Sequence, residues 1–464
     1  MNHATHQTAE GINASQWQRL FWLCIITGVL ARVVAIFFRD FWLDELWSSY
    51  FSHPGRPLAE VIRLTIDDVH PPLYQILLHY WFTLFGFSEL AGRSLSLLAG
   101  LLAMAGFALL AQTVYPRPAA RLATMLFACS SFAILYCAEV RSYQLLLMLS
   151  CFSGYFLFAR LLHHQRWSLA GYFVSGLLAA YTHYFGVILL ASQALIALFW
   201  IVRYRDRRLL AELAAVYLAM ALAWSPMLGH VLADTGRDSF WIQNPGPLKL
   251  AAYLLVYFGG PLALPFLLFP LMAIIRARPP FGLREAALLA AALAILLLPW
   301  LAGFFTHPIT NPRNIIIALP YWLLLTGFVT AFLGQRARTA FVLLNLLIAI
   351  LTTALMPLYK GERTDTLLAG VKASGLPLYM VNGGKLDTAG FIATKLQLNP
   401  QRYAGVSLAV FDAQQPPQAA RYWLACYHTC DAIDLEQQVP PGYRIEHRIE
   451  ARGVRGLQLA PAEP

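Results

Sequence analysis

Long apolar runs recur along this chain from residue 17 to about residue 358, and many of them can cross a hydrocarbon core roughly 30 Å thick. Of the 464 residues, 58% are hydrophobic and only 12% are charged, against about 25% charged residues in soluble domains. The pattern predicts an α-helical, polytopic membrane protein. The first run, about residues 18–38, lacks a small-residue cleavage site and is interpreted as a retained span.

Arginines are concentrated in alternate loops between the apolar runs. By the positive-inside rule these loops are cytoplasmic. The rule predicts about eleven spans within residues 17–358, with residues 1–16 as a cytoplasmic tail and residues 359–464 outside. The same arginines explain the net charge of +10 without a nucleic-acid ligand. The basic positions are Arg117, Arg121, Arg160, Arg166, the run 203–208, Arg276, Arg278, Arg284, Arg336 and Arg338.

The apolar segment 71–86 tests this count. As a helix it reaches only about 24 Å, which is shorter than the hydrocarbon core. Inserting it as a span would also invert every later loop. We therefore interpret it as an interfacial helix, with Gln75 and His79 on one face. Residues 39–93 then form one long external loop that carries both acidic clusters of this region.

The tail, residues 359–464, has an ordinary charge density. Helix-like runs at 364–373 and 388–396 alternate with strand-like runs at 376–381 and 406–411, which predicts a small α/β domain outside the membrane. In an oxidising compartment, Cys426 and Cys430 of the CYHTC segment can form a disulfide. A metal site that uses His428 is a poorly specified alternative.

Asp44 and Glu45 follow the first apolar run directly. On a helix, adjacent side chains diverge by about 100°, so both carboxylates cannot address one hydroxyl. We expect one to act as a general base for a hydroxyl and the other to orient it or hold a neighbour. The alternative is that Asp44 only caps a helix at 45–51.

His70 precedes two prolines in the segment DVHPPL. The first proline favours an extended conformation at His70, and the prolines suit the first turn of the following helix. His70 is thereby placed beside a helix start, where anions are favoured. The alternative is a rigid turn with an exposed histidine.

Other ionisable residues occupy turns on the same external side. Glu139, Arg141 and Tyr143 lie together in YCAEVRSYQL, His183 lies in YTHYFG, and Arg313 opens a span. Ionisable residues at the edge of hydrocarbon are functional candidates. The alternatives are a snorkelling Arg141 with Glu139 as its counter-ion and an aromatic-belt position for His183.

Arg32 and Trp241 have simpler interpretations. Arg32, inside the first span, is explained by snorkelling. Trp241 is either an interface anchor or a contact for a lipid or an acceptor.

The external residues combine carboxylates with cationic side chains. A carboxylate can act as a base and cations can bind a phosphate, so together they can displace a phosphate leaving group.

The Asp-Glu pair followed by DVHPPL closely resembles the first external loop of the protein O-mannosyltransferases. GFSELAGRSLSLLAGLLA, EVRSY, YTHYFG and PRNIIIALP resemble bacterial relatives, including the lipid A aminoarabinose transferases. The resemblance covers roughly residues 15–335. It implies a GT-C fold and an inverting transfer of a hexose or pentose from a polyprenyl-phosphate donor to an acceptor hydroxyl. It also implies a periplasmic site in a bacterial inner membrane and a lipid, glycan or protein acceptor.

By this resemblance Asp44 is the base and Glu45 its partner. The resemblance also places His70 in the site, and we expect Arg141, His183 and Arg313 to bind the donor phosphate. Glu139 and Tyr143, which lie beside Arg141, complete the predicted donor-binding set. Two departures affect it: Gln75 stands where the eukaryotic enzymes have Lys, and Asn314 where many relatives have an aromatic residue.

Two questions stay open at the level of the sequence. A carboxylate-rich loop could hold Mg²⁺ or Mn²⁺, although no ligand spacing requires a metal.

A transporter or lipid flippase, or a partner subunit without activity, is an alternative to an enzyme. Transporters place ionisable residues near the membrane midplane in repeated, broken helices. Here these residues gather at one surface, which favours the enzyme.

Overall fold

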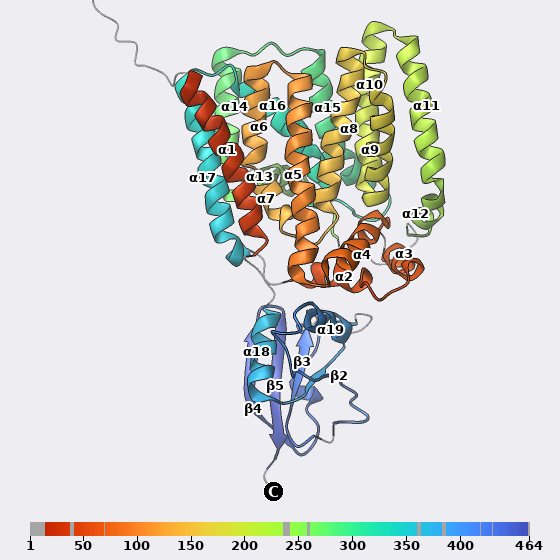
Figure 1. Cartoon of the computed structure of the whole chain (residues 1–464), viewed down its shortest axis with the longest axis vertical. Helices are drawn as coiled ribbons and strands as arrows, with labels where there is room; N and C mark the ends of the chain where they lie inside the picture. Colours follow the sequence, from red (N-terminus) through yellow and green to blue (C-terminus); the bar gives the residue numbers. More distant parts are fainter. Residues whose placement is uncertain are drawn as a thin grey trace, which may run out of the picture.

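The computed structural model consists of a helical bundle and a smaller sheet-containing domain at one end of it (Figure 1). Trp241 and most of the tail 1–16 fall outside the residues that the structure describes. The described residues are 14–37, 41–68, 70–234, 242–257, 260–359, 363–382, 387–417, 419–428 and 430–462.

The bundle contains fourteen α-helices and three 3₁₀ turns within the described residues. The helices are α1 (Ala14–Ala35), α5 (Glu89–Val114), α6 (Arg117–Ala128), α7 (Ser131–Cys137), α8 (Tyr143–His163), α9 (Ser168–Thr182), α10 (Phe185–Tyr204), α11 (Arg207–Trp224), α12 (Leu228–Asp234), α13 (Pro247–Tyr257), α14 (Leu264–Ala277), α15 (Leu283–Ala302), α16 (Leu319–Thr330) and α17 (Gln335–Tyr359). The 3₁₀ turns are η1 (Ser225–Met227), η2 (Gly260–Ala263) and η3 (Asn314–Ala318).

Among the described residues, seven helices are long and apolar enough to cross a membrane, and the bent pair α6–α7 makes an eighth. The other seven are α1, α5, α8, α10, α11 with α12, α15 and α17. Four shorter apolar helices, α9, α13, α14 and the η3–α16 segment, lie in the same bundle (Figure 1). The number of about eleven spans stays a prediction. The polytopic helical fold class is thus confirmed.

The two ends of the bundle differ in character. Figure 1 shows the start of α1 and the α10–α11 connection at the upper end, and α2, α3, α4 and the sheet domain at the lower end. The connection at 203–208 is arginine-rich. The arginine-rich connection and the first loop therefore lie at opposite ends of the bundle, as the arginine pattern predicts. Which end is cytoplasmic stays a prediction.

The first loop folds into three short helices that lie across the lower end of the bundle (Figure 1): α2 (Leu43–Phe51), α3 (Leu58–Asp67) and α4 (Leu73–Phe85). The 13 residues of α4 extend only about 20 Å. Leu78 and Phe82 are buried on one of its faces, whereas Tyr80 and Leu84 are exposed on another. The segment 71–86 is therefore a surface helix across the bundle, as its length predicts.

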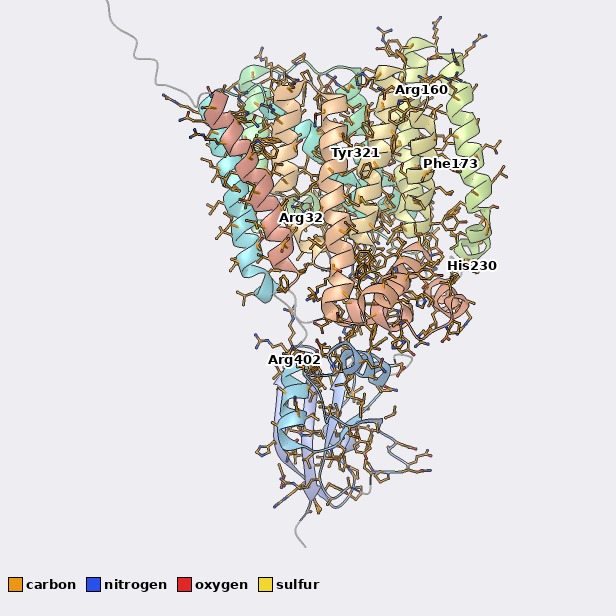
Figure 2. All side chains as sticks on the ribbon, in the orientation of Figure 1. Arg32, Arg160, Phe173, His230, Tyr321 and Arg402 are labelled. Atoms are coloured by element: carbon orange, nitrogen blue, oxygen red, sulfur yellow. A yellow bond between two sulfur atoms is a disulfide. The ribbon has the colours of Figure 1, made fainter. Side chains whose placement is uncertain are left out.

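Arg32 does not snorkel, and that interpretation is wrong. Its side chain is completely buried inside the bundle (Figure 2). Its Nη1 donates to the backbone oxygens of Gly28 and Ala128 at 2.9 and 2.6 Å, and its Nη2 donates to that of Phe127 at 3.3 Å. The carbonyls at the end of a helix have no partner within that helix. Arg32 therefore satisfies the last carbonyls of α6, where the chain bends into α7.

The C-terminal domain is a mixed sheet with two helices, and its element bounds are α18 (Thr364–Ser374), β1 (Leu378–Met380), α19 (Thr388–Leu398), β2 (Leu408–Val410), β3 (Tyr422–Tyr427), η4 (Glu436–Gln438), β4 (Tyr443–Ala451) and β5 (Val454–Pro461). The strand order is β2-β1-β3-β5-β4. Leu378 of β1 pairs in parallel with Leu408 and Trp423, whereas β3, β5 and β4 pair antiparallel. The first two helices and strands match the predicted α/β pattern, and the sequence analysis did not identify β3, β4 or β5.

Cys426 and Cys430 are joined by a disulfide. Both sulfur atoms are thereby unavailable as thiolate ligands, so the alternative of a metal site built on CYHTC is wrong. The described residues include no group of three or more His, Cys, Asp or Glu side chains arranged to hold a metal ion.

We expect Arg32→Leu to destabilise the bundle by about 2–4 kcal/mol, because the α6 carbonyls lose their donor in an apolar surrounding. Thermal unfolding of the detergent-purified protein measures this loss. Arg121→Leu is the matched control, since Arg121 is exposed. Equal midpoints for the two variants would contradict the role assigned to Arg32.

Candidate active site

The candidate site is centred on Asp44, in the first turn of α2. The Oδ2 atom of Asp44 lies 2.5 Å from Nη1 of Arg313 and 4.0 Å from Nε of Arg141. Arg141 comes from the turn between α7 and α8, and Arg313 comes directly before η3. Three segments that are far apart in sequence therefore place one carboxylate between two guanidinium groups at the lower end of the bundle.

Arg141 links Asp44 to the histidine of the HPP segment. Its Nη1 donates to Ser48 Oγ at 3.3 Å and to the backbone oxygen of Asp44 at 3.4 Å. Its Nη2 lies 3.5 Å from Nε2 of His70. Only 9% of the Arg141 side chain is exposed. A snorkelling arginine would reach water, so this alternative is wrong and Arg141 belongs to the Asp44 cluster.

The orientation of the His70 ring follows from its acceptors. Nδ1 lies 2.8 Å from the backbone oxygen of Asp68 and 3.3 Å from Oδ2 of the same residue. Because both atoms accept hydrogen bonds, Nδ1 carries a proton. The Nε2 lone pair then faces the Arg141 guanidinium. His70 is thus a fixed part of the cluster and not a freely exposed turn residue.

His183 and Tyr143 form an aromatic wall beside the two arginines. The Tyr143 ring lies 5.9 Å from the His183 ring and 5.8 Å from the Arg313 guanidinium carbon. The backbone N–H of Phe185 donates to Nδ1 of His183 at 3.1 Å. Burial, followed by the neighbouring His70, Arg141 and Arg313, lowers the pKa of His183 well below its ordinary value. His183 is therefore a buried neutral donor through Nε2–H, and the aromatic-belt alternative is wrong.

Glu45 has a different role from its neighbour, and the structure does not support a catalytic one. Its side chain is completely buried. Arg93 of α5 donates to both of its carboxylate oxygens at 3.2 Å. The backbone N–H of Val140 donates to Oε1 at 3.0 Å, and that of Trp42 to Oε2 at 3.4 Å. Glu45 therefore fixes the start of α2 against α5 and against the turn that carries Arg141.

The helix-cap alternative for Asp44 is also wrong. The helix α2 begins at Leu43, with Trp42 as its N-cap, so Asp44 is the second helical residue. The side chain that accepts from the N-cap backbone N–H is that of Glu45. This leaves the Asp44 carboxylate for the two arginines.

Three other residues of the sequence analysis, Glu139, Asn314 and Gln75, are buried. Glu139 is completely buried, and its backbone oxygen accepts from Ser96 Oγ at 2.6 Å. Asn314 donates through Nδ2 to the backbone oxygen of Ile309 at 3.0 Å, which closes the turn next to Arg313. Gln75 is buried in the first turns of α4. The departure at Asn314 thus has a structural explanation in the turn that presents Arg313.

Arg93 is the residue that the sequence analysis missed. It is only 2% exposed, and its guanidinium carbon lies 4.6 Å from the centre of the Phe41 ring. The signal was available in the sequence, because an arginine within an apolar run needs a buried counter-charge. Its partner, Glu45, lies 48 positions away.

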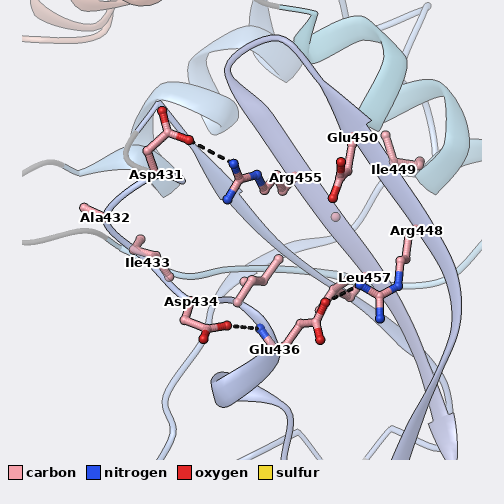
Figure 3. A pocket seen from close by; sticks show the side chains of 12 residues that line it. Asp431, Ala432, Ile433, Asp434, Glu436, Arg448, Ile449, Glu450, Arg455 and Leu457 are labelled. Atoms are coloured by element: carbon pink, nitrogen blue, oxygen red, sulfur yellow. Dashed lines mark hydrogen bonds and ion pairs between the residues drawn. The ribbon is translucent and has the colours of Figure 1, made fainter.

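A cleft of 420 Å³ lies elsewhere, in the C-terminal domain. Figure 3 shows the ion pair between Asp431 and Arg455 at this cleft, and Glu436 there pairs with Arg448. Four of its charged groups form these two pairs, and none of the residues at Asp44 lines it. The cleft is separate from the candidate active site.

Comparisons with known proteins agree with this geometry. A family model described as dolichyl-phosphate-mannose-protein mannosyltransferase matches residues 69–232. The match includes His70, Arg141 and His183. The solved structure of ArnT from Cupriavidus metallidurans in the apo state has a TM-score of 0.64 at 13% identity. The alignment covers 96% of this chain and 98% of ArnT. This chain has a GT-C fold, which it shares with ArnT.

Two further comparisons complete the survey of similar proteins. The structure of the same ArnT bound to undecaprenyl phosphate matches this chain with a TM-score of 0.62 at 14% identity, over 96% of this chain and 98% of ArnT. The Archaeoglobus fulgidus oligosaccharyltransferase in complex with Zn and sulfate has a TM-score of 0.49 at 12% identity, over 89% of this chain and 68% of that chain. A comparison with curated protein sequences gave no match.

The different roles of Asp44 and Glu45 can be distinguished by measuring the stability of single variants. We expect Glu45→Gln to destabilise the protein by about 3–5 kcal/mol, because Arg93 keeps a buried charge without its counter-charge. Asp44→Asn should lower the thermal midpoint by less, since 21% of the Asp44 side chain is exposed. Thermal unfolding in detergent measures both variants. The double variant Glu45→Gln/Arg93→Gln should recover part of the loss, and equal losses for both single variants would refute the assignment.

Proposed function

We propose that this chain is a glycosyltransferase that moves a sugar from a polyprenyl-phosphate donor to an acceptor hydroxyl, with inversion and with Asp44 as the general base. The observation that carries the proposal is the position of the Asp44 carboxylate between Arg141 and Arg313. These residues lie at the end of the bundle that α2, α3 and α4 cover (Figure 1). A base for the hydroxyl and cations for the leaving phosphate are thereby placed within one site.

The reaction is a single displacement in this proposal. The acceptor oxygen attacks the anomeric carbon, its proton passes to Asp44, and the bond from that carbon to the phosphate oxygen breaks with its electron pair leaving on the phosphate. Arg141 and Arg313 stabilise the charge that develops on the phosphate, and neutral His183 can donate a hydrogen bond. One displacement inverts the anomeric centre. The two guanidinium groups provide the positive charge that Mg²⁺ or Mn²⁺ would otherwise provide.

The comparisons support the chemical class of the donor. The matched family is described by a dolichyl-phosphate-mannose donor and a protein acceptor, and the similar ArnT was solved with undecaprenyl phosphate. Both are polyprenyl phosphates. We therefore propose a polyprenyl-phosphate-linked sugar as donor and a lipid, glycan or protein as acceptor.

The site faces the periplasm of a bacterial inner membrane in this proposal. The N-terminus and the arginine-rich connections are cytoplasmic by the positive-inside rule. The disulfide between Cys426 and Cys430 in the domain at the opposite end supports an oxidising compartment there. Lipid-linked sugars that have been moved across the membrane would reach this face.

The ion pair between Asp44 and Arg313 gives the donor a second effect. A phosphate that binds Arg313 competes with Asp44 for the same guanidinium group. Donor binding therefore releases the carboxylate to accept a proton from the acceptor. The base becomes available only when a leaving group is in place, which disfavours activation of an acceptor or of water without donor.

The first test compares membranes from cells that lack the glycosyltransferase with membranes restored by wild type or by Asp44→Asn. Mass spectrometry should find an accumulated lipid-linked sugar and one glycoconjugate that has lost a hexose or pentose mass. Asp44→Asn should lower transfer by a factor of about 10²–10⁴, as expected for loss of a general base.

Asp67→Asn is the matched control for this test. Asp67 lies in the same external loop, and 62% of its side chain is exposed. This variant should restore transfer fully. Full restoration by Asp44→Asn would exclude the proposed base, and unchanged glycans in cells that lack the protein would exclude the proposed activity.

The competition for Arg313 predicts an opposite effect on binding. We expect Asp44→Asn to bind undecaprenyl phosphate about three- to tenfold more tightly than wild type, because a negative charge beside the phosphate site is removed. Arg313→Gln should weaken binding. Titration of the lipid against detergent-purified protein measures both. Weaker binding by Asp44→Asn would show that Asp44 orders the arginines more than it competes for them.

A further inference from the structure

We propose that α19 of the C-terminal domain is a positioning element of the active site, because it holds α2 and the start of α5 in place. The role in catalysis rests on the proposed function of Asp44, which α2 carries. Figure 1 shows α19 at the face of the C-terminal domain that is turned toward α2.

The first contact is aromatic and is made directly on α2. The ring of Phe391 lies 5.0 Å from that of Trp47 and 5.6 Å from that of Tyr50. Trp47 and Tyr50 are separated by about one helical turn, so a single α19 side chain packs across both. The hydroxyl of Tyr50 also donates to Oδ2 of Asp387 at 3.4 Å, next to the start of α19.

The second contact is ionic and is made on α5. The ammonium of Lys395 lies 2.5 Å from Oε1 of Glu89, the first residue of α5. Asn399 donates to the same oxygen at 2.9 Å. Lys395 also lies 3.2 Å from Oδ1 of Asp365 in the C-terminal domain. One lysine thus joins a carboxylate of each body.

The burial of Lys395 indicates that the two bodies stay together. The side chain of Lys395 is completely buried. A buried ammonium without its counter-charges is strongly unfavourable. If the domain separated from the bundle, Lys395 would lose Glu89 as a counter-charge. Water would then have to replace this carboxylate beside the ammonium group. A loosely tethered domain would not require such a pair at its contact surface.

The ionic contact leads directly to the active site. Glu89 and Arg93 are one turn apart on α5, and Arg93 forms the bidentate pair with Glu45 of α2. The C-terminal domain therefore contacts α2 in two ways. Phe391 packs directly on the surface of α2, and α5 connects the domain to the buried Glu45 of α2. Arg141 is bound to the same helix through Ser48.

The apolar packing makes the contact continuous. Leu43 and Leu46 of α2 belong to one buried cluster with Leu368 of α18 and Ile392 of α19. The helix α2 has nine residues, which is shorter than the roughly 12–15 residues at which isolated helices become marginal in water. Its position is therefore set by what packs on it, and the C-terminal domain contributes one side of that packing.

The test is hydrogen exchange on the full-length protein in detergent, followed by mass spectrometry. Phe391→Ala should accelerate exchange of the α2 amides, residues 43–51, by about tenfold, because local opening costs less when a packing partner is lost. Exchange in α8 should not change. In the restored-membrane assay the same variant should lower sugar transfer.

Phe411→Ala is the matched control, because Phe411 is buried in the cluster of the C-terminal domain that contains neither α2 nor α5 residues. It should accelerate exchange within the domain and leave α2 unchanged. Phe391→Leu replaces Phe391→Ala if the latter does not fold. Lys395→Met tests the ionic contact by the same measurement.

Each outcome distinguishes the two proposals. Unchanged α2 exchange in a folded Phe391 variant overturns the positioning role, even if wild type transfers sugar. Faster α2 exchange without reduced transfer shows a structural contact that does not reach the reaction, and it also overturns the proposal. Absence of transfer by wild type refutes the proposed function, whereas the exchange data still report whether α19 holds α2.

Discussion

The buried ion pair between Glu45 and Arg93 is the interaction on which the site depends. It joins the start of α2 to α5, and its third partner, the backbone N–H of Val140, adds the turn that presents Arg141. A carboxylate and a guanidinium removed from water are each costly alone and tolerable only together. The pair therefore specifies one relative position for three segments, and the arrangement of Asp44 and Arg141 follows from it.

The two neighbouring acids divide the work because a helix turns by about 100° per residue. One carboxylate faces the core and is saturated by buried donors. The other faces the end of the bundle, where two arginines and two histidines converge. The residue that holds the site is thereby separate from the residue proposed to react. Substitutions at Glu45 and at Asp44 would consequently lower activity for different physical reasons, one through stability and one through proton transfer.

An ion pair also fixes the C-terminal domain on the helical bundle. The buried Lys395 and the partly buried Glu89 form an ion pair across the contact between the domain and the bundle, and Arg93 lies one turn further along α5. Two ion pairs on α5 thus connect the domain to α2. The surface helices of the first loop are too short to hold a catalytic geometry alone, and they gain it from packing on both sides.

The sequence by itself predicted most of the helices and a difference between the two ends of the bundle, because these depend on local properties. Apolar run length identified the membrane helices, arginine placement separated the two ends, and the length of segment 71–86 identified a surface helix. The family resemblance brought Asp44, His70, Arg141, His183 and Arg313 into one set. Alternating patterns identified half of the C-terminal sheet domain, but not β3, β4 or β5.

Only the tertiary structure decided the partners. Asp44 pairs with Arg313 over 269 positions, and no local pattern encodes which of several external cations comes within 2.5 Å. The same is true of the role of Arg93, of Arg32 at the end of α6, and of Lys395 in the domain contact. Each is a buried charge, and a buried charge takes its role from the atoms that surround it in the folded chain.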